Sequence, residues 1–395
     1  MRGAVVTKVD DVIVIGGGIV GASAAYRLAR SGARVTLVDR ADVGQATAAG
    51  AGIISPGTSY NPPPDFFPLA FHAVAYYDTL LAALAEDGET EAETGFEVVG
   101  LLHVAITEAE AMALPVLLRL IEERHRSGAP RIGAVQMLSG DEARTLFPAL
   151  GACLGAIHTS DAARVDGRLL RDAMRRGAER HGARSVTGSA EAIREVGSGV
   201  ELTVNGETLT AGAAILAGGA WSGALAETLG VGVGVRLPVF PQRGQILHLR
   251  LPDRETAHWP IVVGFHSHYI LTFPRDRVVA GATRESDSGF DARMTAGGVR
   301  EALDEALRVA PGLADATLQE VRVGLRPASP DGLPLLGRIP GCERLYVATG
   351  HGASGLQLGP YSGALVADLA LGQSSAPDLG ADVDLAPFAP ERFAP

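Results

Sequence analysis

Three glycines near the N-terminus have the spacing that holds the phosphates of a dinucleotide. Gly16, Gly18 and Gly21 form G-x-G-x-x-G, and Asp39 follows Gly21 by 18 residues. In this motif the first glycine permits a tight turn, the second lets a pyrophosphate approach the backbone, and the third lets a helix lie close to a strand. The carboxylate of Asp39 can accept hydrogen bonds from a ribose. The pattern therefore predicts a bound adenine dinucleotide.

The elements around these glycines are those that the motif requires. An apolar run at 12–15 predicts a buried parallel strand, the periodicity of 19–30 predicts a helix, and 34–38 predicts a second strand. The N-terminus of that helix then faces the phosphates with free N–H groups. A lone glycine motif is often an ordinary turn, but the surrounding strand, helix and strand favour the nucleotide site.

Composition and charge exclude several classes of partner. The chain has 395 residues, which is enough for two domains with their own cores. Its net charge of −11 argues against nucleic acid and against an anionic membrane surface as partners. Cys153 and Cys342 form neither a disulfide framework nor a set of metal ligands. We therefore expect no metal and a cytoplasmic location.

Two uncharged stretches, 12–26 and 208–226, resemble membrane segments by composition. Both contain several glycines and are better explained as a buried strand, a glycine turn and the start of a helix. Asp10 and Asp11 interrupt any signal peptide. We expect a soluble protein without a transmembrane segment, and a peripheral association with a membrane stays open.

Hydrophobic periodicity predicts the other elements of the chain. The prolines of segment 55–68 (SPGTSYNPPPDFFP) predict a loop that helps to close the pocket. The predicted helices span 68–87, 108–126, 140–147, 166–181, 221–229, 296–309 and 354–371. The predicted strands span 96–106, 152–158, 184–187, 199–204, 212–217, 235–250, 261–273, 277–282, 318–326 and 344–349.

Segments 211–221 (AGAAILAGGAW) and 345–355 (LYVATGHGASG) each read as an apolar strand, a glycine-rich turn and a helix start. Such turns lie at the carboxyl edge of a parallel sheet, where ligands bind. The fold class we expect is α/β, a Rossmann-like nucleotide-binding domain with a discontinuous, β-rich substrate domain. The predicted nucleotide domain comprises 9–60, 150–230 and 325–390, and the predicted substrate domain comprises 61–149 and 231–324.

The chain resembles the FAD-dependent amine and amino-acid oxidoreductases related to D-amino-acid oxidase, glycine oxidase and monomeric sarcosine oxidase. Within this superfamily it is most similar to the glycine oxidase and D-amino-acid dehydrogenase group. The resemblance covers nearly the whole chain and is strongest at 324–337 (GLRPASPDGLPLLG) and 348–359 (ATGHGASGLQLG). The other similar segments are 16–39, 96–107, 217–222, 241–245 and 269–283.

The resemblance implies that the dinucleotide is FAD. The pyrophosphate would lie on Gly16, Gly18 and Gly21, and the adenosine ribose would lie on Asp39. The ribityl chain and flavin edge would lie at 46–52, and the adenine half would lie near 217–221. The flavin pyrimidine ring would lie at 350–357. A helix N-terminus at that ring stabilises the negative charge of a reduced flavin. The expected FAD-binding residues are Gly16, Gly18, Ile19, Val20, Gly21, Asp39, Arg40, Ala46, Thr47, Ala49, Gly50, Ala51, Gly52, Ile53, Ala217, Gly218, Gly219, Trp221, Arg326, Gly350, His351, Gly352, Ala353, Ser354, Gly355, Leu356 and Gln357.

The resemblance also places the substrate. Arg326 would bind the substrate carboxylate, because a guanidinium fork pairs with a carboxylate through two hydrogen bonds. Tyr269 would donate a hydrogen bond to the same carboxylate, and a packing role is the alternative. His351 would touch the flavin or the substrate, or cap a helix, and His268 would line the site. A metal at His258, His266 and His268 is disfavoured, because no acidic pair or cysteine accompanies them.

Two departures from relatives bear on the flavin. Sarcosine oxidases attach FAD through a cysteine before the PDG turn, and Gly324 stands at that place here, so we expect non-covalent FAD. Those enzymes also use a lysine near the flavin for reaction with oxygen, and 278–283 (VVAGAT) contains none.

The activity implied is oxidative deamination of a small amino or imino acid, a D-amino acid or glycine, with hydride passing from the α-carbon to flavin N5. Oxygen or a quinone-like acceptor would take the electrons. No catalytic acid or base is assigned. Alternatives are oxidation of sarcosine, D-proline or another secondary amine, a 2-hydroxy-acid or glycerol-phosphate dehydrogenase, and a flavin-binding subunit of a larger dehydrogenase. A homo-oligomer is possible.

Overall fold

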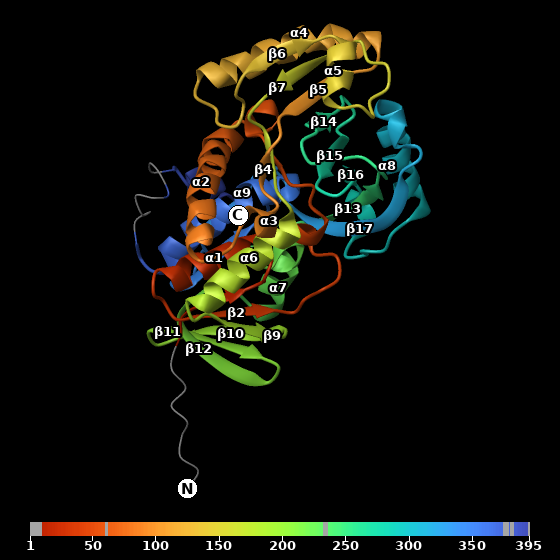
Figure 1. Cartoon of the computed structure of the whole chain (residues 1–395). Helices are drawn as coiled ribbons and strands as arrows, with labels where there is room; N and C mark the ends of the chain where they lie inside the picture. The colour runs from red at the N-terminus through yellow and green to blue at the C-terminus, as the bar shows by residue number, and fades with distance from the viewer. Residues whose placement is uncertain (1–9, 60–61, 232–235, 374–378, 380–382, 394–395) are drawn as a thin grey trace.

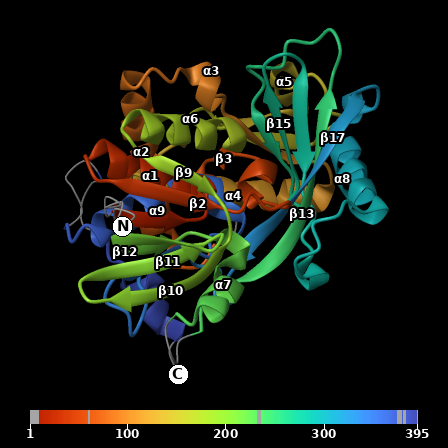
Figure 2. The ribbon, with the colours of Figure 1, turned by 90° about the horizontal axis from the view of Figure 1, so that it is seen from below.

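The structure is a computed structural model that describes residues 10–59, 62–231, 236–373, 379 and 383–393. Two large β-sheets lie in separate halves of the molecule (Figures 1 and 2). Over the described residues each sheet has eight strands. Helices cover both sheets, so the α/β fold class is confirmed.

The first sheet contains the predicted nucleotide-binding strands. β1 (Asp10–Ile15) lies between β12 (Glu207–Leu216) and β2 (Val35–Asp39), and it is parallel to both. β12 also pairs in parallel with β19 (Leu345–Thr349). The segments predicted as separate pieces of one sheet therefore meet at a common carboxyl edge. The remaining strands are β9 (Arg184–Thr187), β10 (Ala190–Val196), β11 (Gly199–Val204) and β18 (Leu335–Arg338).

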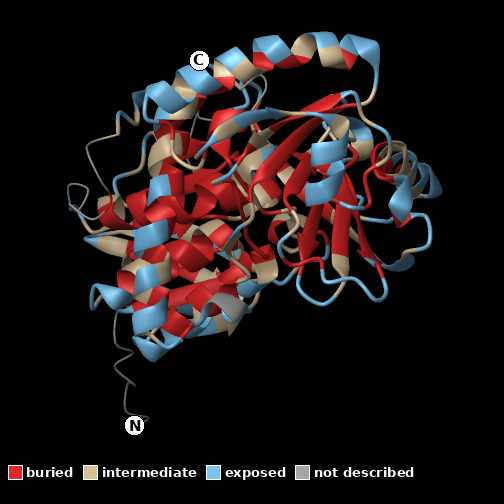
Figure 3. Cartoon of the chain, turned by 45° about the horizontal axis from the view of Figure 1, so that its top comes forward, coloured by how far each residue is buried: buried red, intermediate tan, exposed pale blue. Residues whose placement is uncertain are grey.

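The alternation of β1 separates two layers of core. Val12 and Val14 pack with the helices α1 (Ile19–Arg30), α6 (Gly167–Arg180) and α9 (Gly355–Ala370). Ile13 and Ile15 point to the opposite face and pack with residues of β11 and α7 (Ser222–Leu229). Both faces of β1 are therefore buried, which explains its continuous apolar sequence. Figure 3 shows this burial in the inner strands and the helices against them.

The second sheet runs in the order β17-β13-β16-β15-β14-β5-β7-β6. The pair at one edge of this sheet, β17 and β13, is long and antiparallel. α8 (Ala296–Val309) packs against β13 and β16. The bounds are β5 (Leu101–Ala105), β6 (Val135–Leu138), β7 (Gly155–Thr159), β13 (Phe240–Arg250), β14 (Ile261–Val263), β15 (Tyr269–Phe273), β16 (Arg277–Gly281) and β17 (Thr317–Ala328).

A small third sheet joins β3 (Ile53–Ile54), β8 (Ala163–Arg164) and β4 (Glu97–Val98). The other helices are α2 (Phe66–Glu86), α3 (Glu91–Thr94), α4 (Glu108–Arg126) and α5 (Gly140–Leu146). The helices predicted from periodicity are confirmed, with ends that agree within two residues.

Five strands, β3, β6, β8, β10 and β18, are absent from the sequence prediction, because their short or polar sequences carry little periodicity. The predicted strands 96–106 and 261–273 are each interrupted in the structure, the first into β4 and β5 and the second into β14 and β15. The predicted loop 55–68 is wrong at its end, since α2 begins at Phe66 and includes Pro68. A proline is tolerated in the first turn of a helix, where its missing N–H has no partner. Residue 235, the predicted start of a strand, lies outside the described residues, and β13 begins at Phe240.

The division into two domains stays a prediction. Most strands of each predicted domain lie together in one of the two large sheets. β7 differs, because it lies in the predicted nucleotide segment 150–230 but pairs with β5 and β6 in the second sheet. β17 also runs unbroken across the predicted boundary between 324 and 325. Residues 9, 60 and 61, at other predicted boundaries, lie outside the described residues.

In the described ranges, α2 is the one helix long and apolar enough to cross a membrane. Leu69, Ala73 and Tyr77 on this helix are buried in the core. The Tyr77 hydroxyl donates a hydrogen bond of 2.5 Å to the Leu356 carbonyl of α9. These contacts are those of a core helix in a globular domain.

We expect folding stability to fall as the pH drops below about 6.5, the ordinary pKa of histidine. Burial lowers the pKa of His103, on β5, to about 4. Between these values the unfolded chain binds a proton that the native state excludes, so the free energy of unfolding rises with pH in this window. Each such histidine contributes up to about 3 kcal/mol. The difference in Tm between pH 5 and pH 7 should be smaller in His103→Gln than in the wild type. An equal difference in the two proteins would contradict the account.

Candidate functional site: a nucleotide cavity with a cationic end

A cavity of about 360 Å³ opens where β1, β12 and β19 end. This volume lies within the range of sites for small molecules and cofactors. Nearly all the residues predicted for FAD line it. They are Gly16, Gly18, Ile19, Val20, Asp39, Arg40, Ala46, Thr47, Ala49, Gly50, Ala51, Gly52, Ile53, Ala217, Gly218, Gly219, Trp221, Arg326, His351, Gly352, Ala353, Gly355, Leu356 and Gln357.

The glycine turn at one end of the cavity admits no larger residue. Gly16 has φ +110°, and a Cβ there would lie 2.3 Å from the Ala217 carbonyl oxygen. A Cβ on Gly21 would lie 1.8 Å from the Gly16 carbonyl oxygen. Gly21 does not line the cavity and instead allows α1 to start tightly against the turn. This geometry suits a tight turn at Gly16 and close packing at Gly21, whereas contact of these glycines with the pyrophosphate stays a prediction.

Thr47 and Asp39 shape the cavity beside α1. Thr47 belongs to the short helix η1 (Ala46–Ala49), and its Oγ1 accepts a hydrogen bond of 2.9 Å from the Ile19 backbone N–H. Asp39 ends β2, where its carboxylate accepts hydrogen bonds from the Ala41 N–H and the Gln45 side-chain amide. An acid at the tip of the second strand is the arrangement that binds a ribose.

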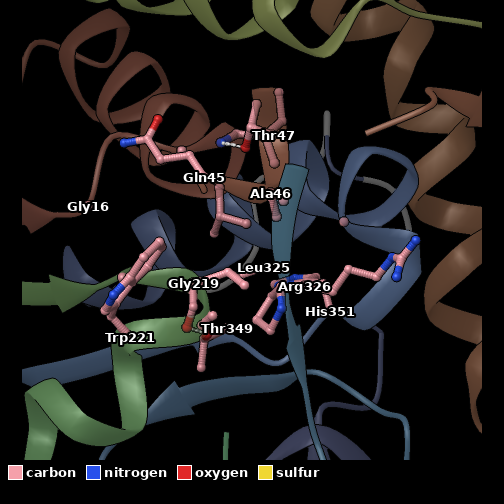
Figure 4. A pocket seen from close by; sticks show the side chains of 18 of the residues that line it. Gly16, Gln45, Ala46, Thr47, Gly219, Trp221, Leu325, Arg326, Thr349 and His351 are labelled. Carbon is pink, nitrogen blue, oxygen red and sulfur yellow. Dashed lines mark hydrogen bonds between the residues drawn. The ribbon is translucent and has the colours of Figure 1, made fainter. Parts of the chain in front are cut away.

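Two further loops complete the cradle. The Thr349 hydroxyl, at the end of β19, donates to the Gly219 carbonyl at 2.9 Å and accepts from the Ser222 hydroxyl at 3.0 Å. This bond ties the loop after β12 to the loop after β19. Figure 4 shows Trp221 and Gln45 on one side of the cavity and Arg326 on the other. The glycine turn, the ribose acid and the three strand ends therefore fit FAD.

Arg326 supplies a cation at the other end of the cavity. It lies on β17, and its Nη1 donates a hydrogen bond of 2.9 Å to the Thr283 carbonyl. No ion pair with a carboxylate joins it among the described residues. Burial lowers the pKa of Arg326, and the nearby Tyr269 hydroxyl opposes that shift. A guanidinium held in this way can pair with an incoming carboxylate.

Tyr269 lies beside Arg326, as predicted. It starts β15 and lines the cavity, and its hydroxyl is close enough to the Arg326 guanidinium for the two groups to shift each other's pKa. Burial raises the pKa of Tyr269, whereas the positive charges of Arg326 and Arg284 lower it. The phenol therefore stays protonated near neutral pH and can donate a hydrogen bond to an anion.

His351 presents a neutral ring to the cavity. It is 3% exposed, and neither ring nitrogen has a hydrogen-bond partner among the described residues. Burial lowers the pKa of His351 to about 4, so the ring is uncharged at neutral pH. An unpartnered polar ring on a cavity wall is suited to contact a bound molecule.

Three other predicted residues lie away from the cavity wall. Gly350 and Ser354 form the turn before α9 without lining the cavity. His268 lines a separate small cavity with Glu305 and Arg308 behind β15. His268 is not among the residues that line the cavity with Arg326, so the structure does not join it to the predicted substrate site. Within the described residues no cluster of side chains could hold a metal ion.

Sequence reasoning missed several residues that line the cavity. Gln45, Thr349, Arg284 and Gly244 are among them. Gln45 and Thr349 directly adjoin segments predicted to bind FAD, and this adjacency was the only signal for them. Gly244 lies on β13 and Arg284 lies in the extended segment that follows β16, and only the backbone pairing of these segments brings the two residues to Arg326.

Gly244 leaves the space in which the Arg326 guanidinium lies. A Cβ on Gly244 would stand 2.5 Å from Cζ and Nη2 of Arg326. We expect Gly244→Ala to displace the guanidinium and to lower kcat/KM by about 10- to 100-fold, as loss of a charged hydrogen bond does. FAD content and Tm should change little, because the clash falls on the end of a flexible side chain. Unchanged kinetics would show that the guanidinium position is unimportant.

Comparisons with known proteins agree with this geometry. The crystal structure of iminodiacetate oxidase (IdaA) from Chelativorans sp. BNC1 is 42% identical, with a TM-score of 0.88 over 96% of this chain and 98% of that one. Glycine oxidase of Geobacillus kaustophilus (strain HTA426) is 33% identical over 97% of each chain. The crystal structure of glycine oxidase from Geobacillus kaustophilus has a TM-score of 0.83 over 97% of this chain and 98% of that one. The oxidoreductase YurR of Bacillus subtilis (strain 168) is 41% identical over 96% of this chain and 98% of its own.

The family model named DAO, FAD dependent oxidoreductase, matches residues 11–369. This match confirms the resemblance inferred from the glycine motif and from 324–337 and 348–359. The chain belongs to the DAO family of FAD-dependent oxidoreductases, of the glycine oxidase and iminodiacetate oxidase type, and its cofactor is FAD.

Proposed function

We propose that this protein oxidises a small amino or imino acid with FAD as the electron acceptor. The observation that carries the proposal is Arg326, a half-buried cation that faces the FAD cavity without a carboxylate partner among the described residues. A substrate carboxylate would supply the missing charge. Glycine oxidase and iminodiacetate oxidase, to which the chain is similar, are both named for substrates that carry a carboxylate on the carbon next to nitrogen.

The side chains around the cavity orient such a substrate. Arg326 would bind its carboxylate with a two-pronged set of hydrogen bonds, and Tyr269 would donate one more. These bonds fix the position of the α-carbon, which is the main contribution that a protein makes to this chemistry. His351 stays neutral and leaves the amine lone pair without a competing cation. We assign no catalytic acid or base.

Bound FAD supplies an acceptor for the two electrons and the α-hydrogen of the amine. The imine product takes up water and separates into a 2-oxo acid and an amine. Oxygen is the proposed final acceptor, and a quinone is the alternative. Glycine, D-amino acids, sarcosine, D-proline and iminodiacetate are the proposed candidates. We also propose non-covalent FAD, since the cavity wall at 324 is glycine and contains no cysteine.

The proposed location is the cytoplasm, and association between copies of the chain stays possible. A second candidate, oxidation of a 2-hydroxy acid or of glycerol phosphate, uses the same fold but has no observation in its favour.

Product analysis tests the proposal. The purified flavoprotein is incubated with each candidate amine, with lactate and with glycerol 3-phosphate, and hydrogen peroxide and 2-oxo acid are quantified. We expect equal amounts of both products from at least one amine. Turnover of lactate or glycerol phosphate alone would reject the proposal. Turnover that requires a second purified subunit would favour the multi-subunit alternative.

A further inference from the structure

A second arginine, Arg284, lines the same cavity as Arg326 and Tyr269. Its positive charge acts on both of these residues, which places it at the same end of the cavity. Unlike Arg326, its side chain is exposed, so it stands toward the solvent side of the cavity. This end of the cavity therefore carries two cations.

Strand alternation explains why Arg284 faces the cavity. Thr283 and Glu285, on either side of it, turn their side chains to Gln245 on β13. The backbone of Glu285 pairs with that of Arg243, which continues the extended pairing beyond β16. Because neighbouring residues in extended backbone point to opposite faces, Arg284 points to the face that holds Gly244 and Arg326. The Thr283 carbonyl that precedes it accepts the hydrogen bond from Arg326.

The acidic side chain nearest in sequence is already occupied. Glu285 accepts hydrogen bonds from Arg243 through Oε2, and from Gln245 and Thr283 through Oε1. Arg243 is further paired with Asp291. Neither Arg284 nor Arg326 forms an ion pair with a carboxylate in the part of the chain that the structure describes. A substrate with one carboxylate would neutralise only one of the two cations.

We propose that Arg284 binds a second carboxylate of the substrate, so that the site takes an imino dicarboxylic acid of the iminodiacetate class in preference to glycine or sarcosine. This inference rests on the proposed function. One carboxylate would lie on Arg326 and Tyr269, and the other on Arg284 at the solvent side. Neutralising both cations makes the dicarboxylate bind more tightly than its monocarboxylate analogue. The 42% identity to an iminodiacetate oxidase points in the same direction.

The reaction balances with water and oxygen as co-reactants. A C–H bond of one carboxymethyl group breaks, its electron pair and hydrogen leave to FAD, and the nitrogen lone pair forms a C=N bond. Water adds to that carbon, and the C–N bond breaks to give glyoxylate and glycine. Oxygen takes the two electrons with two protons and becomes hydrogen peroxide.

The experiment compares iminodiacetate with sarcosine, in which a methyl group replaces one carboxymethyl group. In wild-type protein we expect kcat/KM for iminodiacetate to exceed that for sarcosine by about 10- to 100-fold, the worth of one charged hydrogen-bonded pair. Arg284→Gln should bring the ratio of the iminodiacetate value to the sarcosine value toward one, and Arg284→Lys should restore part of the preference. The control is Arg250→Gln, an exposed arginine of the same sheet that is paired with Asp276 outside the cavity.

A binding measurement separates failure of this inference from failure of the proposed function. Diglycolate and methoxyacetate are the ether counterparts of the two amines, and they cannot form an imine. Calorimetry should give a Kd ratio that favours diglycolate in the wild type and approaches one in Arg284→Gln. If Arg284→Gln lost affinity equally for both ligands, or if the wild type bound the two ligands equally well, the role of Arg284 would be overturned. Preserved diglycolate preference without oxidation of any amine would instead reject the proposed function.

Discussion

Arg326→Gln is expected to lower kcat/KM for the amino-acid substrate by about 100- to 1,000-fold, because removal of one partner from a buried charged pair costs about 3–4 kcal/mol. Glutamine retains one hydrogen-bond donor group but loses the charge and the fork. Arg326→Lys keeps the charge and should lose less, although its ammonium cannot form the two parallel bonds. The loss should appear mainly in KM if the carboxylate is held equally in ground and transition states. Steady-state kinetics with the substrate that turns over best gives both constants.

The flavin serves as the internal control for this experiment. Arg326 stands at one end of the cavity and the glycine turn at the other, so FAD content and the visible spectrum of Arg326→Gln should stay close to those of the wild type. Arg250→Gln controls for loss of an arginine from the same sheet. If Arg326→Gln retains the wild-type kcat/KM with full FAD, the carboxylate is bound elsewhere and the proposed orientation of substrate is wrong.

Gly21→Ala is the second change with a large expected effect, here on the cofactor. A Cβ at this position would lie 1.8 Å from the Gly16 carbonyl oxygen, which is backbone and cannot rotate away. Either α1 or the glycine turn must therefore shift, and overpacking of this kind costs about 1–3 kcal/mol. We expect protein with little bound flavin, and an FAD affinity reduced by about 10- to 100-fold, the equivalent of that cost.

Gly297→Ala provides a matched control for this substitution. Gly297 also lies in the first turn of a helix, α8, and a Cβ there meets nothing within 4 Å. Alanine is the better helix former, so Gly297→Ala should keep its flavin and gain slight stability. Flavin titration of the two apoproteins measures the difference. Equal FAD affinity in Gly21→Ala and Gly297→Ala would mean that the turn at Gly16 adapts without cost.

The nucleotide half of the molecule could be predicted because its signals are local. Gly16, Gly18, Gly21 and Asp39 lie within one strand–helix–strand unit, and short-range sterics fix their arrangement. Apolar periodicity then located the longer helices, because each of them buries one stripe against a sheet. The resemblance at 324–337 located Arg326 on β17, beside the cavity that the nucleotide motif predicted.

The substrate end depended on pairing that the sequence does not encode locally. Gly244 meets Arg326 only through the register of β13 with β17. Arg284 faces the cavity only because its neighbour Glu285 pairs with Arg243. Neither residue has a local signal of function. His268 was placed in the site by proximity to Tyr269 in sequence, but it lines a separate small cavity. Strand register and backbone pairing therefore account for the missed residues, and nearness in sequence was a poor guide to the position of His268.

Anaerobic reduction of the bound flavin tests the central claim most directly, since it requires no knowledge of the final electron acceptor. Purified wild-type protein and Arg326→Gln are mixed without oxygen with iminodiacetate, glycine, sarcosine, D- and L-amino acids, proline, 2-hydroxy acids and glycerol phosphate. The account predicts that one or more amino or imino acids bleach the flavin absorbance of the wild type quickly and that of Arg326→Gln far more slowly. Bleaching by a 2-hydroxy acid or by glycerol phosphate, with none by any amine, would contradict it.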